Sequence, residues 1–393
     1  MRGLLPLSNQ EFEDALNSHH DLIAPPSSYA YLISLRALRK PLLVITASSK
    51  AAEDLAKEIR ECHPDTLEFP AWETLPHERL SPSSDTVAKR ISTLQALQDR
   101  NRNWVVVAPI RAVIHKFNSQ IIETKPITID RGVEFDLTEL QRELVSFSYS
   151  RTDLVERRGE FAVRGGILDI FPPDQNHPIR IDFFGDEIED LSYFAVADQR
   201  TFESISSSVK VLPCRELLIT DEIRTKARNL ATKYENELLN KISNGMLPEG
   251  MESLIPMLVD KLELITASMP KNFESIFIES ERVVSRLSDL LATNQEFKEA
   301  AWSNAAIGGN APVPIEVENT YIEWDELIAQ LPNYKDFRQF GSDDDLFLDL
   351  NSIEPLRGNS ERLISIIESA INENKKVIFS ASSKGMIDRY ASI

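Results

Sequence analysis

The chain has 393 residues, enough for about two to four domains at the usual ~100–200 residues each. Its two cysteines exclude a disulfide framework, and its apolar runs are far shorter than the ~20 residues that cross a bilayer, so we expect a cytoplasmic protein with no membrane span. The formal net charge of −19 repels nucleic-acid phosphates unless the basic residues gather on one face, and it therefore favours protein partners.

The first part of the chain has the pattern of an α/β domain. Pro41–Thr46 is a continuous apolar run, which is typical of a strand buried on both faces of a parallel sheet. A helix capped by Ser48 or Ser49 follows this strand, and a second helix follows Ser81–Asp85. Trp104–Ala108 then predicts a second buried strand, so the order is strand, helix, helix, strand.

Around Ile127 the pattern changes to short alternating strands. We expect strands at Gly166–Phe171 and Ile179–Phe184, and Gly185-Asp186 should join the second of these to Glu187–Leu191 as a tight hairpin. This part of the chain therefore predicts a small sheet domain inserted into the first one.

Beyond Pro213 the pattern is helical as far as about Met269. Near the C-terminus, Ile378–Lys384 has the same strand-to-helix pattern as Val44–Lys50, which favours a shared type of turn over a true internal repeat. We expect a further α/β domain to begin there. Because Ile393 ends the chain before such a domain can close, we also expect the chain to be truncated.

The sequence offers no site for phosphate or metal chemistry. A phosphate-binding loop needs Gly-x4-Gly-Lys-Ser/Thr, and none of the thirteen glycines begins that pattern. Asp186-Glu187 follows Gly185 in a predicted hairpin rather than ending a buried strand, which argues against magnesium binding. The six histidines lack metal-ligand spacing, so we expect no catalytic residue, no cofactor and no metal.

The predicted strand Ile179–Phe184 has an unusual outer face. Strand alternation turns three apolar side chains to the core, namely Ile179, Ile181 and Phe183. Arg180 and Phe184 then point outward, and arginine and aromatic side chains are common anchors of protein interfaces. The alternative is that a helix covers Phe184 while Arg180 pairs with Asp182, and the sequence supports both interpretations equally.

Two segments of the predicted insert resemble a sequence shared by two families of bacterial nucleotide excision repair proteins. They are Glu160–Pro172 and Arg180–Ile188, and the families are the excinuclease subunit UvrB and the transcription-repair coupling factors, which both use this domain to bind UvrA. Trp72–Pro76 resembles the first domain of the coupling factors. Leu22–Tyr29 also stands where UvrB carries an intact phosphate-binding loop, which again favours the coupling factors.

The resemblance implies a fold and a domain order. Residues 1–125 and 213–332 would form a degenerate helicase-like (RecA-like) parallel-sheet domain, and the second of these parts would be mostly helical. Residues 126–212 would be the inserted α+β UvrA-binding domain, and residues 333–393 the start of a third α/β domain.

The family's UvrA contacts carry over to three positions that match the motif in type and spacing, namely Arg164, Arg180 and Phe184. By the same resemblance, the chain is a non-catalytic docking module that recruits UvrA to stalled RNA polymerase. The family protein binds polymerase and DNA, and holds its ATP-driven motor, in domains further along the chain.

The sequence disfavours two other functions. An ATP-dependent DNA translocase or helicase subunit is disfavoured because the nucleotide motifs are missing. A UvrB-like DNA-binding protein is disfavoured by the net charge and by the short region around His115–Thr124, where UvrB inserts a DNA-clamping hairpin.

Overall fold

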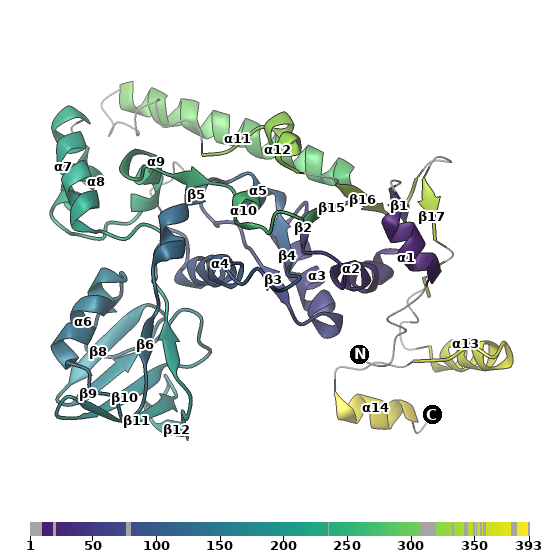
Figure 1. Ribbon diagram of the computed structural model, residues 1–393, viewed down its shortest axis with the longest axis horizontal. Coiled ribbons are helices and arrows are strands. Elements are labelled where there is room, and N and C mark those ends of the chain that lie inside the picture. The colour runs from purple at the N-terminus through teal and green to yellow at the C-terminus, as the bar shows by residue number, and fades with distance from the viewer. Residues whose placement is uncertain are drawn as a thin grey trace.

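The computed structural model describes residues 10–391, with gaps at 19–20, 76–79, 235, 307–319, 332–333, 342–344, 349, 351, 354–355, 357–358 and 379–382. A parallel α/β domain lies at the centre, and a smaller sheet domain stands at one end of it (Figure 1). The predicted fold class, an α/β domain with a small inserted sheet domain, is confirmed.

The central sheet has seven strands in the order β17-β1-β16-β15-β2-β4-β3, and all the paired neighbours are parallel. Both strands predicted in the first part of the chain are present, as β2 (Leu42–Thr46) and β4 (Val105–Pro109), and every residue in them is buried. The remaining strands are β1 (Leu22–Ile23), β3 (Thr66–Glu68), β15 (Glu274–Ile278), β16 (Lys335–Arg338) and β17 (Leu346–Phe347).

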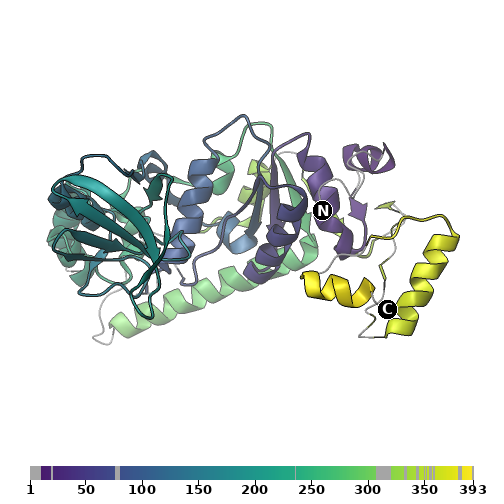
Figure 2. The ribbon, with the colours of Figure 1, turned by 90° about the horizontal axis from the view of Figure 1, so that it is seen from below.

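Helices cover both faces of this sheet, which is why the two strands β2 and β4 are almost entirely apolar. One face carries α1 (Gln10–Asn17), α2 (Tyr29–Ala37) and α3 (Ser49–Cys62). The other carries α4 (Ser84–Ala96), α5 (Ile110–Val113) and the long α11 (Ser280–Ala306), which runs along the domain in Figure 2. The predicted cap of α3 is Ser48, whose hydroxyl accepts a hydrogen bond from the Ala51 amide.

The helical pattern predicted after Pro213 is also confirmed. The helices of this stretch are α7 (Asp221–Tyr234), α8 (Glu237–Ser243), α9 (Ile255–Leu258) and α10 (Ile265–Ser268), and α12 (Trp324–Gln330) lies further along the chain. Between α9 and α10, β14 (Leu262–Glu263) pairs with β5 (Phe117–Asn118).

Residues 127–211, here called the insert, leave the parallel-sheet domain after β5 and return to it before α7. A six-stranded sheet in the order β12-β11-β10-β9-β8-β7 forms most of the insert, and β6 (Ile127–Ile129) pairs with β13 (Val209–Val211) at its two ends. Apolar side chains between this sheet and α6 (Leu137–Ser146) form a separate core. The six strands are β7 (Ser150–Arg151), β8 (Glu160–Arg164), β9 (Ile167–Ile170), β10 (Ile179–Phe184), β11 (Glu187–Phe194) and β12 (Thr201–Ser204).

The boundary predicted at residue 333 does not mark the end of the first domain. β16 lies between β1 and β15 in the parallel sheet, and β17 pairs with β1, so the sheet extends as far as Phe347. Beyond it, α13 (Ser360–Asn372) and α14 (Lys384–Ala391) stand apart from the sheet (Figure 1). Most of the strand predicted just before Lys384 lies outside the described residues.

An ion pair with no solvent exposure holds the segment that leaves the insert against α4. The Arg90 Nε donates to Glu216 Oε1 at 2.5 Å, and both side chains are 0% exposed. The same carboxylate oxygen accepts from Trp72 Nε1 at 3.0 Å, and the guanidinium lies 4.2 Å from the centre of the Phe69 ring. Asn118 donates to the backbone oxygen of Glu216 at 3.1 Å, so β5 is joined to the same segment.

We predict that Arg90→Met lowers the free energy of unfolding by about 3–5 kcal/mol, because it leaves the Glu216 carboxylate buried without its counter-ion. Urea denaturation followed by circular dichroism measures this loss. Lys50→Met is the control, since Lys50 and its partner Asp54 are both well exposed, and it should leave the midpoint almost unchanged. Equal small effects of the two substitutions would contradict the importance of the buried pair.

His115 is buried beside this ion pair, with the rings of Trp72 at 4.4 Å and Tyr321 at 5.3 Å between centroids. Burial lowers the pKa of its imidazole well below the usual range, and the charges of Arg90 and Arg111 add to the effect. The folded chain therefore keeps this histidine neutral at pH values where the unfolded chain protonates it.

We predict that acid destabilises the protein through His115. Since only the unfolded chain takes up this proton, the free energy of unfolding should fall as the pH drops below ~6.5, by up to about 1.4 kcal/mol per pH unit. Urea titrations at several pH values measure the slope, and His115→Gln should flatten it in this range. Parallel slopes for the two proteins would show that His115 is not the responsible group.

Candidate protein-binding surface

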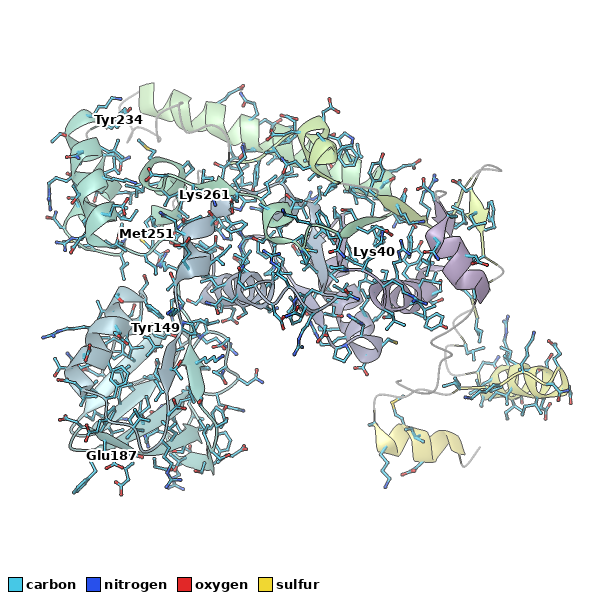
Figure 3. The ribbon with its side chains drawn as sticks, viewed as in Figure 1. Lys40, Tyr149, Glu187, Tyr234, Met251 and Lys261 are labelled. Atoms are coloured by element: carbon cyan, nitrogen blue, oxygen red, sulfur yellow. The ribbon has the colours of Figure 1, made fainter. Side chains whose placement is uncertain are left out.

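The hairpin between β10 and β11 has the two-residue turn that the sequence predicts. Phe184 pairs with Glu187, and Gly185, between them, has a φ of 65°, in the left-handed region that glycine adopts without strain. Glu187 lies at the end of the insert that points away from the parallel-sheet domain (Figure 3). The turn therefore presents its flanking side chains at an extremity of the molecule.

The side chains of β10 alternate as predicted. Ile179 and Ile181 are fully buried, and Phe183 packs against the core of the insert. Phe184 is 77% exposed, so in the part of the chain that the structure describes no helix covers it. The register with β11 shifts between Asp182 and Phe183, a bulge that precedes this exposed ring.

The alternative interpretation, in which Arg180 pairs with Asp182, is wrong. The bidentate partner of Arg180 is Asp169, which lies directly opposite it on β9, with Nε–Oδ1 at 2.7 Å and Nη2–Oδ2 at 2.9 Å. Nη1 donates to the Gln199 backbone oxygen at 3.2 Å, and the guanidinium lies 4.9 Å from the centre of the Phe194 ring. Arg180 is thus fixed on several sides.

Arg164 reaches the same carboxylate from the other side. Its Nη2 donates to Asp169 Oδ2 at 2.6 Å, and its side chain remains 47% exposed, whereas that of Asp169 is 0% exposed. The structure therefore brings two of the three predicted site residues together through an aspartate that sequence reasoning did not select. The feature of the sequence that could have indicated Asp169 is its charge, because it lies in the otherwise apolar strand β9.

A shallow hollow of about 520 Å³ lies beside Arg180 on this face of the sheet. Among the residues that line it are Asp182, Asp190 and Glu203, with Phe202 from the edge strand β12. Burial raises the pKa of the Asp182 carboxyl, and nearby carboxylates add to the effect although Arg180 opposes it. The face thus combines two arginines, a group of carboxylates and exposed aromatic rings, which suits a polar protein interface.

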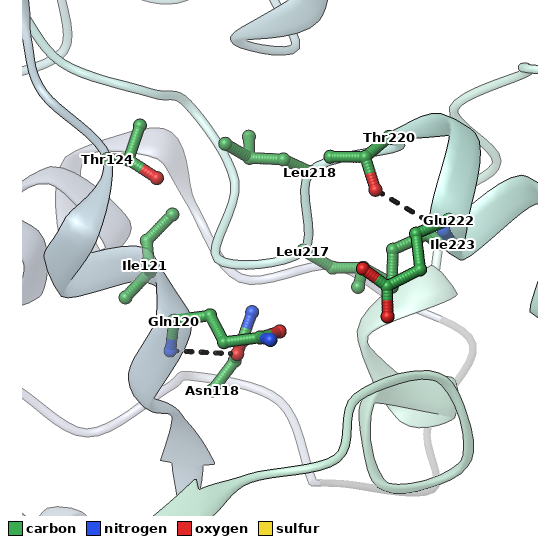
Figure 4. Close-up of a pocket in the computed structure, with 9 residues that line it drawn as sticks. All are labelled: Asn118, Gln120, Ile121, Thr124, Leu217, Leu218, Thr220, Glu222 and Ile223. Carbon is green, nitrogen blue, oxygen red and sulfur yellow. Dashed lines mark hydrogen bonds between the residues drawn. The ribbon is translucent and has the colours of Figure 1, made fainter.

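A second cavity, of about 190 Å³, lies between the 3-10 helix η2 (Ser119–Glu123) and the start of α7 (Figure 4). Its polar groups form hydrogen bonds within the fold. Asn118 Oδ1 accepts from the Gln120 amide at 3.1 Å, and the Thr220 hydroxyl accepts from the Ile223 amide at 3.3 Å. Both hydrogen bonds cap the start of a helix, so these polar side chains have a role in stabilising the fold.

The turn after β1 lacks the backbone donors of a phosphate-binding loop. Pro25 precedes the 3-10 helix η1 (Pro26–Ser28), and neither proline has the backbone N–H that a phosphate-binding loop supplies. Tyr29 is buried at the start of α2 and donates to Glu279 Oε1 at 3.3 Å. Burial and the Glu279 charge raise the pKa of this hydroxyl, so it stays protonated.

Within the described ranges, no group of three or more His, Cys, Asp or Glu side chains is arranged to hold a metal ion. Nor does any helix of the described chain have the length and apolar character needed to cross a membrane.

Residues 127–217 match the family model of the UvrB interaction domain. The chain is also similar to the transcription-repair-coupling factor of Mycobacterium tuberculosis, with 38% identity over 332 residues, which are 78% of this chain and 27% of that protein. The coupling factor of Escherichia coli is 27% identical over 306 residues, covering 75% of this chain and 26% of that protein. The chain thus spans about a quarter of the length of these relatives.

A more distant similarity links the chain to the UvrABC system protein B of Microcystis aeruginosa. The two are 27% identical over 269 residues, which are 63% of this chain and 40% of that protein. The resemblance to both repair families is therefore confirmed.

Proposed function

We propose that this chain, a relative of the transcription-repair-coupling factors with a UvrB interaction domain at residues 127–217, is a docking module that binds the nucleotide excision repair protein UvrA. One observation carries the proposal: Arg164, Arg180 and Phe184, the three positions that match the family motif, all lie at the outer face of the insert sheet.

Phe184 is the best candidate for the central anchor of this interface. A phenylalanine that is 77% exposed keeps a large apolar surface in water, and a partner that covers the ring releases that water. Arg164 and Arg180 then supply directional hydrogen bonds elsewhere on the same face of the sheet. A few residues of these types commonly provide most of the binding energy of a protein interface.

In this proposal the chain contributes recruitment alone. Stalled RNA polymerase, DNA and the ATP-driven motor would be handled by other parts of a longer protein, since the chain spans about a quarter of the coupling factors it matches. The turn at Pro25 and Pro26 supports a module that does not hydrolyse ATP, because its backbone lacks the amides that would cradle a phosphate.

We predict that Phe184→Ala weakens UvrA binding by at least ~2 kcal/mol, about thirtyfold in affinity, because it removes an exposed aromatic anchor. Isothermal titration of the full chain with purified UvrA measures the change. The melting temperature should stay the same, since the ring makes little contact with the rest of the fold.

Phe340→Ala is the matched control, because Phe340 is also 77% exposed but belongs to the parallel-sheet domain. It should bind UvrA like the wild type. If the wild-type chain does not bind UvrA, the proposed function is wrong. If both alanine variants bind equally well, the location of the surface is wrong.

We also predict that the purified chain neither binds nor hydrolyses ATP. A fluorescent ATP analogue titrated with magnesium present should give no saturable signal, and phosphate release should stay at the level of the buffer. Saturable binding or hydrolysis would instead favour the ATP-dependent translocase or helicase subunit.

A further inference from the structure

Asp169 is a charged residue at a fully buried position of the insert. Its carboxylate is 0% exposed, and it accepts three hydrogen bonds from two guanidinium groups, two from Arg180 and one from Arg164. It cannot itself contact a protein that docks on the surface. Any contribution to docking must therefore pass through the arginines.

The Arg180 pair is bidentate, with two charge-assisted N–H···O bonds, a geometry that adds both strength and a fixed orientation. Because the charge of Asp169 is withdrawn from water, it needs these donors in the unbound protein as much as in a complex. The carboxylate therefore keeps the guanidinium in one orientation before any partner arrives.

The two arginines are held to different degrees. Arg180 also contacts Phe194 and the Gln199 backbone, and only 16% of its side chain is exposed. Arg164 is 47% exposed, and among the hydrogen bonds of the described residues only its Nη2 has an acceptor. Its remaining donors suit an oxygen acceptor on the partner, a carboxylate or a backbone carbonyl.

We propose that Asp169 is a positioning residue for UvrA binding, and this inference rests on the function proposed above. Its buried carboxylate orders Arg164 and Arg180 in the free chain. A flexible arginine loses rotamer freedom when a partner immobilises it, and ordering it beforehand removes that cost from the binding step. Asp169 would thus strengthen an interface that it never touches.

The test is Asp169→Asn in the full chain, which keeps the size of the side chain and removes its charge. We expect UvrA affinity to fall at least about tenfold, while circular dichroism still shows a folded protein. An affinity equal to that of the wild type would overturn the inference.

Combined substitutions separate positioning from a general structural effect. In a chain that carries both Arg164→Met and Arg180→Met, which remove the two guanidinium groups, Asp169→Asn should change the affinity by less than about twofold, because the groups through which it acts are gone. Combined with Phe184→Ala, its effect should multiply, because Phe184 lies four strand positions, about 13 Å, from Arg180. If Asp169→Asn lowers the affinity by the same factor in both backgrounds as in the wild type, the positioning role is overturned.

A measurement on the free wild-type chain keeps the inference testable even if Asp169→Asn does not fold. In nuclear magnetic resonance spectra, the Nε–H of Arg180 should give a resolved signal that exchanges slowly with water. A signal that merges with those of the exposed arginines would mean that the guanidinium is not ordered. Absence of UvrA binding by the wild type overturns the proposed function, whereas equal binding by wild type and Asp169→Asn overturns only the role of Asp169.

Discussion

The ion pair of Arg90 with Glu216 is the constraint on which the relation between the two domains depends. The insert interrupts the parallel-sheet domain, so the chain must leave that domain and return at a defined place. Glu216, just beyond the last strand of the insert, is fixed to α4 by a guanidinium that is itself enclosed by aromatic rings. An ion pair of the insert itself with α4, between Arg158 and Asp85, is partly open to water and contributes little. Backbone contact adds to the constraint, because a Cβ on Gly159 would lie 3.3 Å from both Cys214 Sγ and Ser84 Oγ.

In the proposed function, the parallel-sheet domain is a scaffold and the insert carries the recognition surface. The parallel-sheet domain has helices on both faces of its sheet, and two prolines and the buried Tyr29 occupy the turn after β1. The insert carries the surface with the two arginines and the exposed Phe184. Its hairpin turn lies at the end remote from the parallel-sheet domain (Figure 3). A rigid attachment is useful in this arrangement, since a partner on the hairpin is then held at a fixed position relative to the scaffold.

Sequence patterns predicted what depends on neighbours along the chain. The buried strands β2 and β4, the Ser48 cap and the parity of β10 follow from local rules of period and capping, and the structure confirms them. Contacts between distant segments were not predictable in this way. The pairing of Arg180 with Asp169 depends on the register of β9 against β10, and the return of β16 to the first sheet depends on a crossover from beyond residue 333. Whether a helix covers Phe184 also depends on tertiary packing. The alternation of side chains along a strand does not predict it.

The exposure of Phe184 has a consequence for the behaviour of the protein in concentrated solution. A single apolar ring at an extremity is a point through which copies of the chain can adhere to one another. The net charge of −19 opposes this, because copies of the chain repel one another at long range. Salt weakens that repulsion, since the screening length falls from about 8 Å at physiological ionic strength to about 3 Å at 1 M. At physiological ionic strength, the acidity of the chain thus opposes self-association through the uncovered ring of Phe184.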